Sequence, residues 1–396
     1  MTEEAPQLKT DVVVIGGALT GMTIACALAA RHLPVTVIEK RPAADIASAK
    51  SDGRTSAISH GSKEILAKYG LWDMLAPEAG PIFDIRVSDA DSSLFVHYDH
   101  ELVSDEPMGY IVENHFFLQK LYEKAATLPH LKIIAPAAFT SIERDAQHAV
   151  ITLDNGQTVQ SSLVIAADGR PSKVRETAGI KTYSWSYHQT AIVCNIRHEK
   201  SHQGIALERF LPAGPFASLP MHDPYLSSLV WTEKDALAPL YLAMEEEEFL
   251  FEIQKRLGSC WGNISLASAR FNYPLSLIHA KQYTAERLAL AGDAAHGIHP
   301  IAGQGFNLGI RDIEVLADLL IYQHELGLDV GTPDVLAQYA RSRHWDNFSM
   351  VAVTDGLNRL FSNSILPFKV SRRLGLGAVN KTLPLKRFFM KQAMGE

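Results

Sequence analysis

Residues 11–21 read Asp11-Val-Val-Val-Ile-Gly-Gly-Ala-Leu-Thr-Gly21. The apolar run at the start of this segment predicts a short parallel strand that is buried on both faces. A glycine-rich turn follows, and the apolar residues 22–30 predict a helix. A second apolar run, Val35–Ile38, ends at Glu39. The pattern indicates a strand–helix–strand unit at the beginning of the chain.

The turn between this strand and helix has the features of a nucleotide-binding loop. Gly16 permits a tight turn after the strand, and Gly21 allows helix and strand to pack closely. The free amide groups and the positive dipole end of the helix would face a pyrophosphate. Glu39, which Lys40 follows, is placed to accept a hydrogen bond from an adenosine ribose. Ala18 stands where a second glycine is usual and would narrow the approach, so a glycine-rich loop without a ligand is the alternative.

A second motif follows another predicted buried strand, Leu163–Ala166. It reads Asp168-Gly-Arg-Pro-Ser-Lys-Val-Arg175 and resembles the DGxxSxxR fingerprint of flavin-dependent aromatic hydroxylases. Asp168 is expected at the carboxyl end of its strand, where open α/β sheets bind their ligands. The matching positions of Ser172 and Arg175 argue against an ordinary Asp-Gly turn followed by a surface arginine.

The third motif is the strongest. Its residues are Gly292-Asp293, directly after a predicted strand, and then the run His299-Pro300-Ile-Ala-Gly303-Gln304-Gly305-Phe306-Asn307. The carboxylate of Asp293 is placed to accept a hydrogen bond from a polyol, here the ribityl chain of FAD. Gly303 and Gly305 have no side chains, so the backbone can approach a flat ring. A helix beginning near Asn307 would direct amide groups at the pyrimidine end of that ring and stabilise negative charge there.

The order and spacing of the three motifs predict one bound FAD. An extended FAD spans roughly 20 Å, so the residues that bind it should come from distant parts of the chain. Short β-like runs separate the second and third motifs. The sequence therefore predicts an α/β fold with a Rossmann-like FAD-binding domain, an inserted β-sheet substrate domain and C-terminal helices. The expected bounds are residues 1–80, 105–181 and 284–340 for the FAD-binding domain, 81–104 and 182–283 for the substrate domain, and 341–396 for the C-terminal segment.

The chain as a whole resembles the class A flavoprotein monooxygenases, which share the para-hydroxybenzoate hydroxylase fold. The block from His299 to Asp312 is similar to the signature of the ubiquinone-biosynthesis hydroxylases within that class. The segments 52–59 and 112–114 resemble the same group, and the likeness extends from Asp11 to about Asp312. His115 stands where an arginine is usual, so no flavin contact is expected of it.

The resemblance implies roles for particular residues. Arg54 would lie close to the flavin, while Asp168 and Arg175 would serve both the pyrophosphate and a pyridine nucleotide. Residues 300–307 would line the isoalloxazine. The flavin-side candidates for catalysis are His299, Pro300 and Gln304, although a packed histidine is the more common role for His299. No particular base stands out.

The resemblance also implies a reaction. NAD(P)H would reduce the flavin, O₂ would add to it as a hydroperoxide, and one oxygen would pass to the aromatic ring of a polyprenyl phenol in ubiquinone biosynthesis. The protein would have to exclude water, which promotes unproductive release of hydrogen peroxide. Two alternatives remain, namely a hydroxylase of another aromatic substrate and a non-catalytic flavoprotein subunit of a biosynthetic assembly.

The composition excludes other classes of protein. A net charge of -7 gives no reason to expect nucleic-acid binding. The three cysteines, Cys26, Cys194 and Cys260, form no closely spaced pair, so no metal site is expected and a reducing cytoplasm is the expected compartment. The polar N-terminus predicts no signal peptide, and no apolar stretch is long enough to predict a membrane span.

The C-terminal tail is basic, unlike the rest of the chain. From residue 369 onward, seven basic residues are accompanied by one acid, Glu396. A helix over residues 384–391 would have one apolar face and basic residues beside it, formed by Leu385, Phe388 and Phe389 and by Lys386, Arg387 and Lys391. Such a helix can lie on an anionic membrane surface, where a polyprenyl substrate would reside, or contact a biosynthetic complex. The alternative is a terminal helix docked on the domain with a solvated basic rim.

Overall fold

The computed structural model describes residues 8–48, 51–89, 95–299, 303–361 and 382–395. Its first sheet has eight strands in the order β18-β19-β11-β1-β2-β8, with β10 beside β11 and β9 beside β10. These strands are β1 (Leu8–Ile15), β2 (Val35–Ile38), β8 (Leu131–Ile134), β9 (Phe139–Arg144), β10 (Ala149–Leu153), β11 (Thr158–Ala166), β18 (Thr284–Ala285) and β19 (Leu288–Leu290).

Neighbouring strands β19, β11, β1, β2 and β8 of this sheet are parallel. Their carboxyl ends coincide, because Ile15 pairs with both Ala166 and Ile38, and Ala166 pairs with Leu290. Parallel strands buried on both faces consist of nearly continuous apolar residues, as residues 12–15 of β1 and all of β2 do. This register brings the turns of all three sequence motifs to one edge of the sheet.

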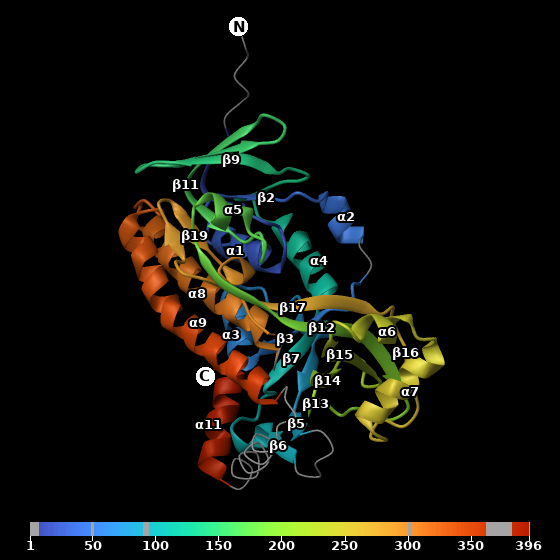
Figure 1. Ribbon diagram of the computed structural model, residues 1–396. Helices are drawn as coiled ribbons and strands as arrows, with labels where there is room; N and C mark the ends of the chain where they lie inside the picture. The colour runs from blue at the N-terminus through green and yellow to red at the C-terminus, as the bar shows by residue number, and fades with distance from the viewer. Residues whose placement is uncertain (1–7, 49–50, 90–94, 300–302, 362–381, 396) are drawn as a thin grey trace.

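Helices cover the parallel strands. Helix α1 (Leu19–Ala29) contacts α4 (Asn114–Ala125) and α8 (Gln304–Glu325) as well as the strands beneath it. Helix α8 in turn packs along α9 (Pro333–Phe361), and Figure 1 shows the two side by side at the left of the molecule. The main hydrophobic core lies between these helices and the sheet.

The second sheet has nine strands in the order β20-β17-β12-β15-β14-β13-β5-β6, with β16 beside β12. Helices α6 (Ala238–Ala243) and α7 (Glu246–Leu257) lie against it (Figure 1). Phe249 of α7 stacks on Trp231 of the sheet. The strands are β5 (Asp84–Asp89), β6 (Phe95–Asp99), β12 (Thr182–His198), β13 (Ile205–Leu211), β14 (Gly214–Pro220), β15 (Leu226–Lys234), β16 (Ile264–Leu266), β17 (Phe271–Ala280) and β20 (His296–Gly297).

A third, three-stranded sheet lies beside α3 and α8. It has the order β3-β7-β4. Its strands and the remaining short elements are β3 (Thr55–Ser59), β4 (Gly80–Ile82), β7 (Gly109–Glu113), α2 (Ala43–Ser48), α3 (His60–Lys68), α5 (Lys173–Thr177), α11 (Leu383–Met394) and the 3₁₀ turns η1 (Ala76–Glu78), η2 (His100–Leu102) and η3 (Gly292–Ala294).

The two large sheets are joined at the third motif. The chain leaves β19 in the first sheet, passes through η3 and enters β20, which pairs with β17 of the second sheet. The turn that carries Asp293 therefore lies at the junction of the two sheets.

The predicted fold class is confirmed. Two local details differ from the sequence-based expectations: β11 runs without a break from Thr158 to Ala166, and α8 begins at Gln304 rather than near Asn307. The domain bounds remain a prediction. Within the described part of the chain, no helix is both long enough and apolar enough to cross a bilayer.

Candidate cofactor site

The turn after β1 cannot accommodate side chains at its glycines. A Cβ on Gly16 would lie 2.4 Å from the carbonyl oxygen of Ala167, and one on Gly21 would lie 1.9 Å from that of Gly16. Helix α1 begins after Ala18 with no side-chain cap and no acidic residue in its first turn. Its first amides and positive dipole end are therefore available to an anion. Ala18, the residue directly before the helix, is exposed.

Glu39 lies at the end of β2 and is 5% exposed. Its Oε2 accepts a hydrogen bond from the amide of Gly17 at 2.7 Å, and its Oε1 accepts from the amide and Nε of Arg41 at 3.0 and 3.3 Å. A carboxylate has about four acceptor positions, so Glu39 keeps capacity for one further donor. Lys40 is exposed beside it.

Arg175 of the second motif joins the loop of that motif to the turn of the third motif by hydrogen bonds. Arg175 is 9% exposed, and its guanidinium donates to the carbonyl oxygens of Ala294 at 2.7 Å and Arg170 at 2.8 Å. Oδ2 of Asp168 accepts from the amide of Val174 at 3.2 Å, while its buried Oδ1 has no partner among the described residues. Arg175 thus joins two loops, and Asp168 has one acceptor oxygen left for a ligand.

Arg170 is a site residue that the sequence analysis missed. Its Nε donates to Oδ2 of Asp293 at 3.1 Å, and its Nη1 and Nη2 donate to the carbonyl oxygens of Ser276 and Ile298 at 3.0 and 3.1 Å. A Cβ on Gly297 would lie 2.7 Å from Arg170 Nε, so the arginine requires glycine there. No sequence signal marks Arg170, because its partners come from separate segments.

Arg54 lies at the other side of the site. Its guanidinium contacts Oδ2 of Asp52 at 2.5 Å and lies over the ring of Tyr273 at 5.0 Å from the centroid. Partial burial lowers the pKa of Arg54, but the charges of Asp52 and, more weakly, Asp293 outweigh it and raise that pKa. Asp293 is thus among the charges that act on Arg54, and a position of Arg54 close to the flavin stays a prediction.

The start of α8 leaves room for a flat ring. Gly303 caps the helix with a φ of +63° and, as at α1, there is neither a side-chain cap nor an acidic residue in the first turn. Among the described residues, a Cβ on Gly305 would have only Ile298 Cγ1 near it, at 4.0 Å. The packing of these residues therefore does not require glycine at residue 305.

The other predicted residues of this motif face protein neighbours. Asn307 is 1% exposed, accepts from the amide of Ser59 at 3.0 Å and donates to the carbonyl oxygen of Ala57 at 2.8 Å. Phe306 packs edge-on against Phe117. The side chain of Asn307 is therefore occupied by protein partners, whereas that of Phe306 stays partly exposed. Gln304 is buried in the first turn of α8, and Pro300 lies outside the described residues.

His299 is fully buried beside β12 of the second sheet. Its Nε2 lies 3.3 Å from Oε1 of Gln189, and its ring packs edge-on against Tyr187. Burial, with the charge of Arg170, lowers the pKa of His299 to about 3. The imidazole is therefore neutral near pH 7, which favours the packing role over that of a proton donor.

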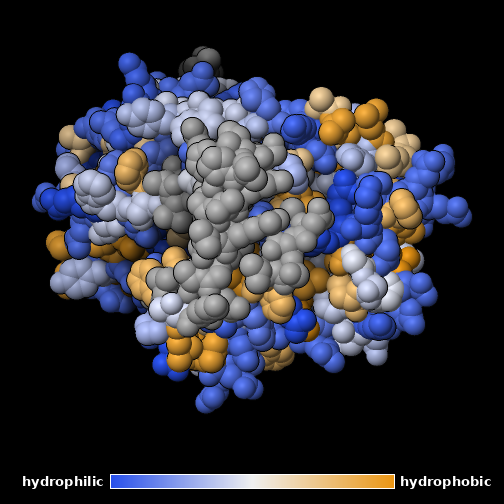
Figure 2. Space-filling model, turned by 60° about the horizontal axis from the view of Figure 1, so that its bottom comes forward, coloured by the Kyte–Doolittle hydropathy of each residue, from blue (hydrophilic) through white to orange (hydrophobic). Residues whose placement is uncertain are grey.

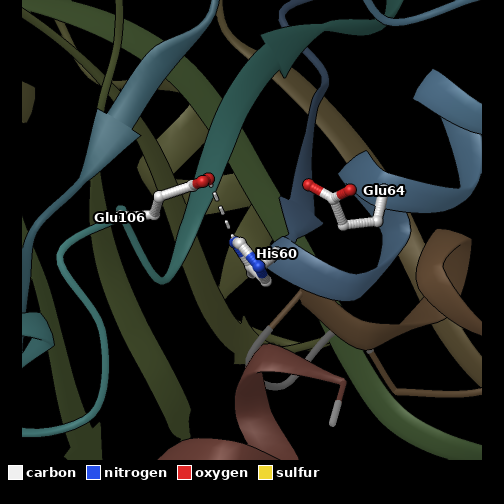
Figure 3. A group of neighbouring side chains, drawn as sticks. All are labelled: His60, Glu64 and Glu106. Carbon is white, nitrogen blue, oxygen red and sulfur yellow. Dashed lines mark ion pairs between the residues drawn. The ribbon is translucent and has the colours of Figure 1, made fainter.

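Two clusters of His, Asp and Glu in the described part of the chain bring possible metal ligands within 4.8 Å, namely His60, Glu64 and Glu106, and Asp84, His97 and Asp99. Figure 3 shows the first, in which His60 faces Glu106. Lys63 Nζ already contacts Glu64 Oε1 at 2.6 Å and Glu106 Oε2 at 3.1 Å. In the second cluster the histidine bonds an aspartate at 2.6 Å. Contacts with Lys63 and between His97 and Asp84 therefore already engage several of these ligand atoms.

The sheet topology and the three converging turns define an FAD-binding α/β protein. The family model described as FAD binding domain matches residues 9–351. The chain is 49% identical to ubiquinone hydroxylase UbiL of Rhodospirillum rubrum over 97% of this chain and 89% of that protein. It is 34% identical to 3-demethoxyubiquinol 3-hydroxylase of Escherichia coli over 98% of both. The chain therefore belongs to the FAD binding domain family and, within it, to the ubiquinone hydroxylases, which confirms the resemblance.

Solved structures share the fold at lower identity. The p-nitrophenol 4-monooxygenase of Pseudomonas putida superposes with a TM-score of 0.81 over 98% of both chains at 20% identity. PqsL of Pseudomonas aeruginosa gives 0.79 over 94% of this chain and all of that chain, at 19% identity. These similarities show the fold alone.

Proposed function

We propose that this protein is an FAD-dependent monooxygenase that uses NAD(P)H and O₂ to hydroxylate the aromatic ring of a polyprenyl phenol in ubiquinone biosynthesis. The convergence of three motif turns at one sheet edge supports the proposal, together with membership of the ubiquinone hydroxylases. When bound, FAD supplies the electron transfer and oxygen activation that amino-acid side chains lack.

Each part of the cofactor has a proposed partner in the chain. The uncapped amides of α1 hold the diphosphate, and Glu39 accepts from the adenosine ribose. Asp293, which Arg170 orients, accepts from the ribityl chain. The amides at the start of α8 face the pyrimidine end of the ring, and Gly305 leaves the ring its space. The buried His299 excludes water between the sheets.

The reaction is tested with the purified, FAD-loaded protein and a prenylated phenol under ¹⁸O₂. We expect NAD(P)H oxidation that depends on the phenol, and one ¹⁸O atom in the ring of the product by mass spectrometry. Hydroxylation of unprenylated aromatics alone would instead favour the broader hydroxylase. A protein that holds FAD but oxidises no NAD(P)H with any phenol would favour the non-catalytic subunit.

We further propose that α11 holds the protein against an anionic membrane surface. The helix docks through Met390 and Met394, which are 1% and 0% exposed and join a cluster with Met108. Its other side exposes Phe388 and Phe389, at 57% and 43%. The helix is thus docked on the protein and also exposes apolar side chains, which supports a peripheral contact with a membrane.

The basic residues of α11 divide between the two sides. Arg387 and Lys391 are exposed near the phenylalanines. Lys386 is only 9% exposed, so the expectation that it lies among the exposed basic residues of the helix is wrong. The side chain of Leu385 lies outside the described residues. In Figure 2 the lower end of the molecule as seen in Figure 1 is turned toward the viewer. Apolar side chains lie among hydrophilic ones on the surface shown there.

This contact is tested by sedimentation with vesicles that contain anionic lipid. We expect the double variant Phe388→Ser, Phe389→Ser to lose most of its binding, because exposed aromatic rings insert at the interface. The control is Phe251→Ser on the glutamate-rich α7, where the phenylalanine is 69% exposed. Equal sedimentation of the double variant and the parent would show a helix that is merely docked.

A further inference from the structure

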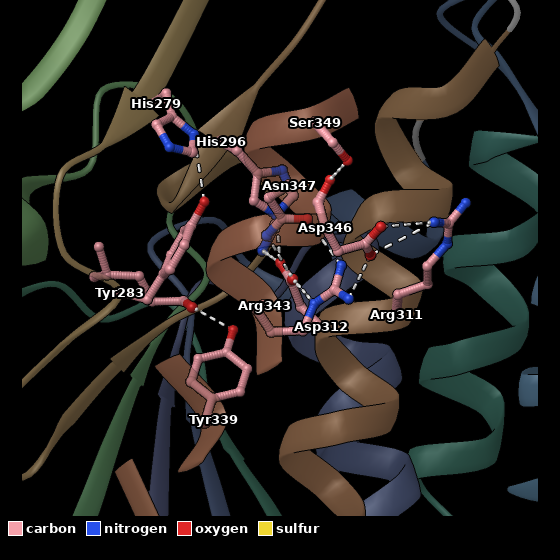
Figure 4. A network of polar contacts seen from close by, with 12 residues as sticks. His279, Tyr283, His296, Arg311, Asp312, Tyr339, Arg343, Asp346, Asn347 and Ser349 are labelled. Atoms are coloured by element: carbon pink, nitrogen blue, oxygen red, sulfur yellow. Dashed lines mark hydrogen bonds and ion pairs between the residues drawn. The ribbon is translucent and has the colours of Figure 1, made fainter. Parts of the chain in front are cut away.

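Figure 4 shows a buried ionic network around Asp312. It contacts the turn that carries Asp293 through the amide of Gly292. Its centre is Asp312 of α8, which is 0% exposed. Oδ2 of this residue accepts from the amide of Gly292 at 3.0 Å and contacts Nε2 of His296 at 2.5 Å. One carboxylate oxygen thus holds both ends of the segment that leads from the first sheet to the second.

The other carboxylate oxygen of Asp312 is held by α9. Its Oδ1 accepts from Nε of Arg343 at 2.8 Å and from Nδ2 of Asn347 at 3.1 Å. Arg343 is 4% exposed and also donates to Asp346 at 2.6 Å and to Oδ1 of Asn347 at 2.8 Å. Four donors therefore surround a carboxylate that has about four acceptor positions.

The charge of Asp312 is kept by these partners. Burial by itself would raise the pKa of Asp312, but His296 and Arg343 outweigh burial and hold that pKa well below its usual range. A buried ionised carboxylate is tolerated only when such partners surround it, and removing one of them leaves an uncompensated charge. The network therefore responds strongly to small changes in any member.

The turn itself has no room to move. Gly292 has a φ of +58°, and a Cβ on it would lie 2.7 Å from Oγ1 of Thr20 in α1. Its amide is held from the opposite side by Asp312. The side chain of Asp293, the next residue, stays 47% exposed toward the candidate site. The contact between Asp312 and the amide of Gly292 thus lies one residue from Asp293, whose carboxylate Arg170 also contacts.

We propose that Asp312 is a positioning residue for FAD, which anchors the amide of Gly292 and so fixes where Asp293 presents its carboxylate. Asp312 itself lies out of contact with the cofactor, and Arg343 and His296 maintain its charge and orientation. The proposal rests on the proposed role of Asp293 toward FAD.

The experiment measures the dissociation constant of FAD for the apoprotein by flavin fluorescence, together with the visible absorbance of bound flavin and thermal unfolding of the apoprotein. Asp312→Asn and Arg343→Lys should each weaken FAD binding by about tenfold or more and alter the flavin absorbance band, because a charge-assisted hydrogen bond is lost. His296→Gln keeps a donor toward Asp312 and should bind FAD within about twofold of the parent, whereas His296→Leu should weaken binding like Asp312→Asn.

The matched control is Arg287→Lys, which alters another arginine, 5% exposed, that pairs with Asp329 at 2.6 Å near the opposite end of β19. It should lower the unfolding temperature of the apoprotein without changing FAD affinity or absorbance. The proposal is overturned if Asp312→Asn and Arg343→Lys lower the unfolding temperature but leave FAD affinity and absorbance unchanged, as expected of the control. If Asp312→Asn fails to fold, Arg343→Lys alone provides this test. Asp293→Asn separates the two proposals: if it alone weakens binding, only the role of Asp312 fails, and if it too binds normally, the assignment of the site fails.

Discussion

At the scale of single residues, His299 shows how burial determines protonation. The lowered pKa of His299, about 3, means that the folded protein keeps this imidazole neutral while the unfolded chain protonates it near 6.5. Between these two values the unfolded state binds more protons. Stability is therefore full above pH 6.5 and falls as the pH decreases toward 3. His279, whose pKa burial lowers to about 4, acts in the same direction.

This linkage predicts the effect of His299→Gln. The parent should lose about 2 kcal/mol of unfolding free energy through this one residue between pH 6.5 and 5, and the variant should lack that part of the loss. Urea unfolding of the apoprotein at both pH values measures the difference. His222→Gln, at an exposed histidine, is the control and should keep the parental slope. A variant with an unchanged slope would show that His299 is protonated in the folded state.

At the scale of elements, the glycines near the starts of α1 and α8 are needed for different physical reasons. Gly16 and Gly21 are required by the protein itself, since a Cβ on either would overlap backbone atoms. Among the described residues, Gly305 has only one side-chain atom within 4.0 Å of where its Cβ would be. Within a helix, glycine is less stable than alanine by up to about 1 kcal/mol. A helical glycine without close neighbours thus costs stability, and the proposed FAD ring would account for it.

Gly305→Ala should therefore separate stability from cofactor binding. We expect the apoprotein to gain about 0.5–1 kcal/mol of unfolding free energy, because helix propensity improves. FAD binding should weaken, since the added methyl group occupies the space of the ring. Gly356→Ala in α9, where a Cβ would meet no atom of the described residues within 4 Å, should stabilise equally and leave FAD affinity unchanged. Equal FAD affinities for both variants would place the ring elsewhere.

At the scale of the whole molecule, Arg170 links the two large sheets across the site. It extends from the loop after β11 to the carbonyl of Ser276 in β17 and that of Ile298 after β20, and it pairs with Asp293 between them. The FAD-binding residues and the second sheet are therefore mechanically coupled through one side chain.

Arg170→Met should remove this coupling. We expect FAD affinity to fall by about tenfold, since a charge-assisted hydrogen bond to Asp293 is lost, and the apoprotein to unfold at a lower temperature. Arg197→Met, which breaks the exposed pair with Asp223 on the second sheet, is the control and should change neither property measurably. Calorimetric titration with FAD measures the affinity, and an unchanged value for Arg170→Met would limit this residue to joining the sheets.

Much of the candidate site could be predicted from the sequence, because its chemistry depends on local rules. A glycine where a turn allows no Cβ, an acid at the end of a strand and an uncapped helix start are visible in consecutive residues. Gly16, Glu39 and Gly292 were identified in this way and lie together at one sheet edge. The sequence did not predict that the side chains of Asn307 and Phe306 face protein neighbours or that Lys386 is buried.

The sequence alone thus determined the α/β class, the three turns and their order along the chain, since backbone sterics and apolar periodicity act over a few residues. Only the tertiary structure decided which charges meet. Arg170 reaches Asp293, and Asp312 reaches Gly292 and Arg343, across segments that no local pattern connects. The physical reason is that a buried charge requires partners in space, and the packing of distant strands and helices selects those partners.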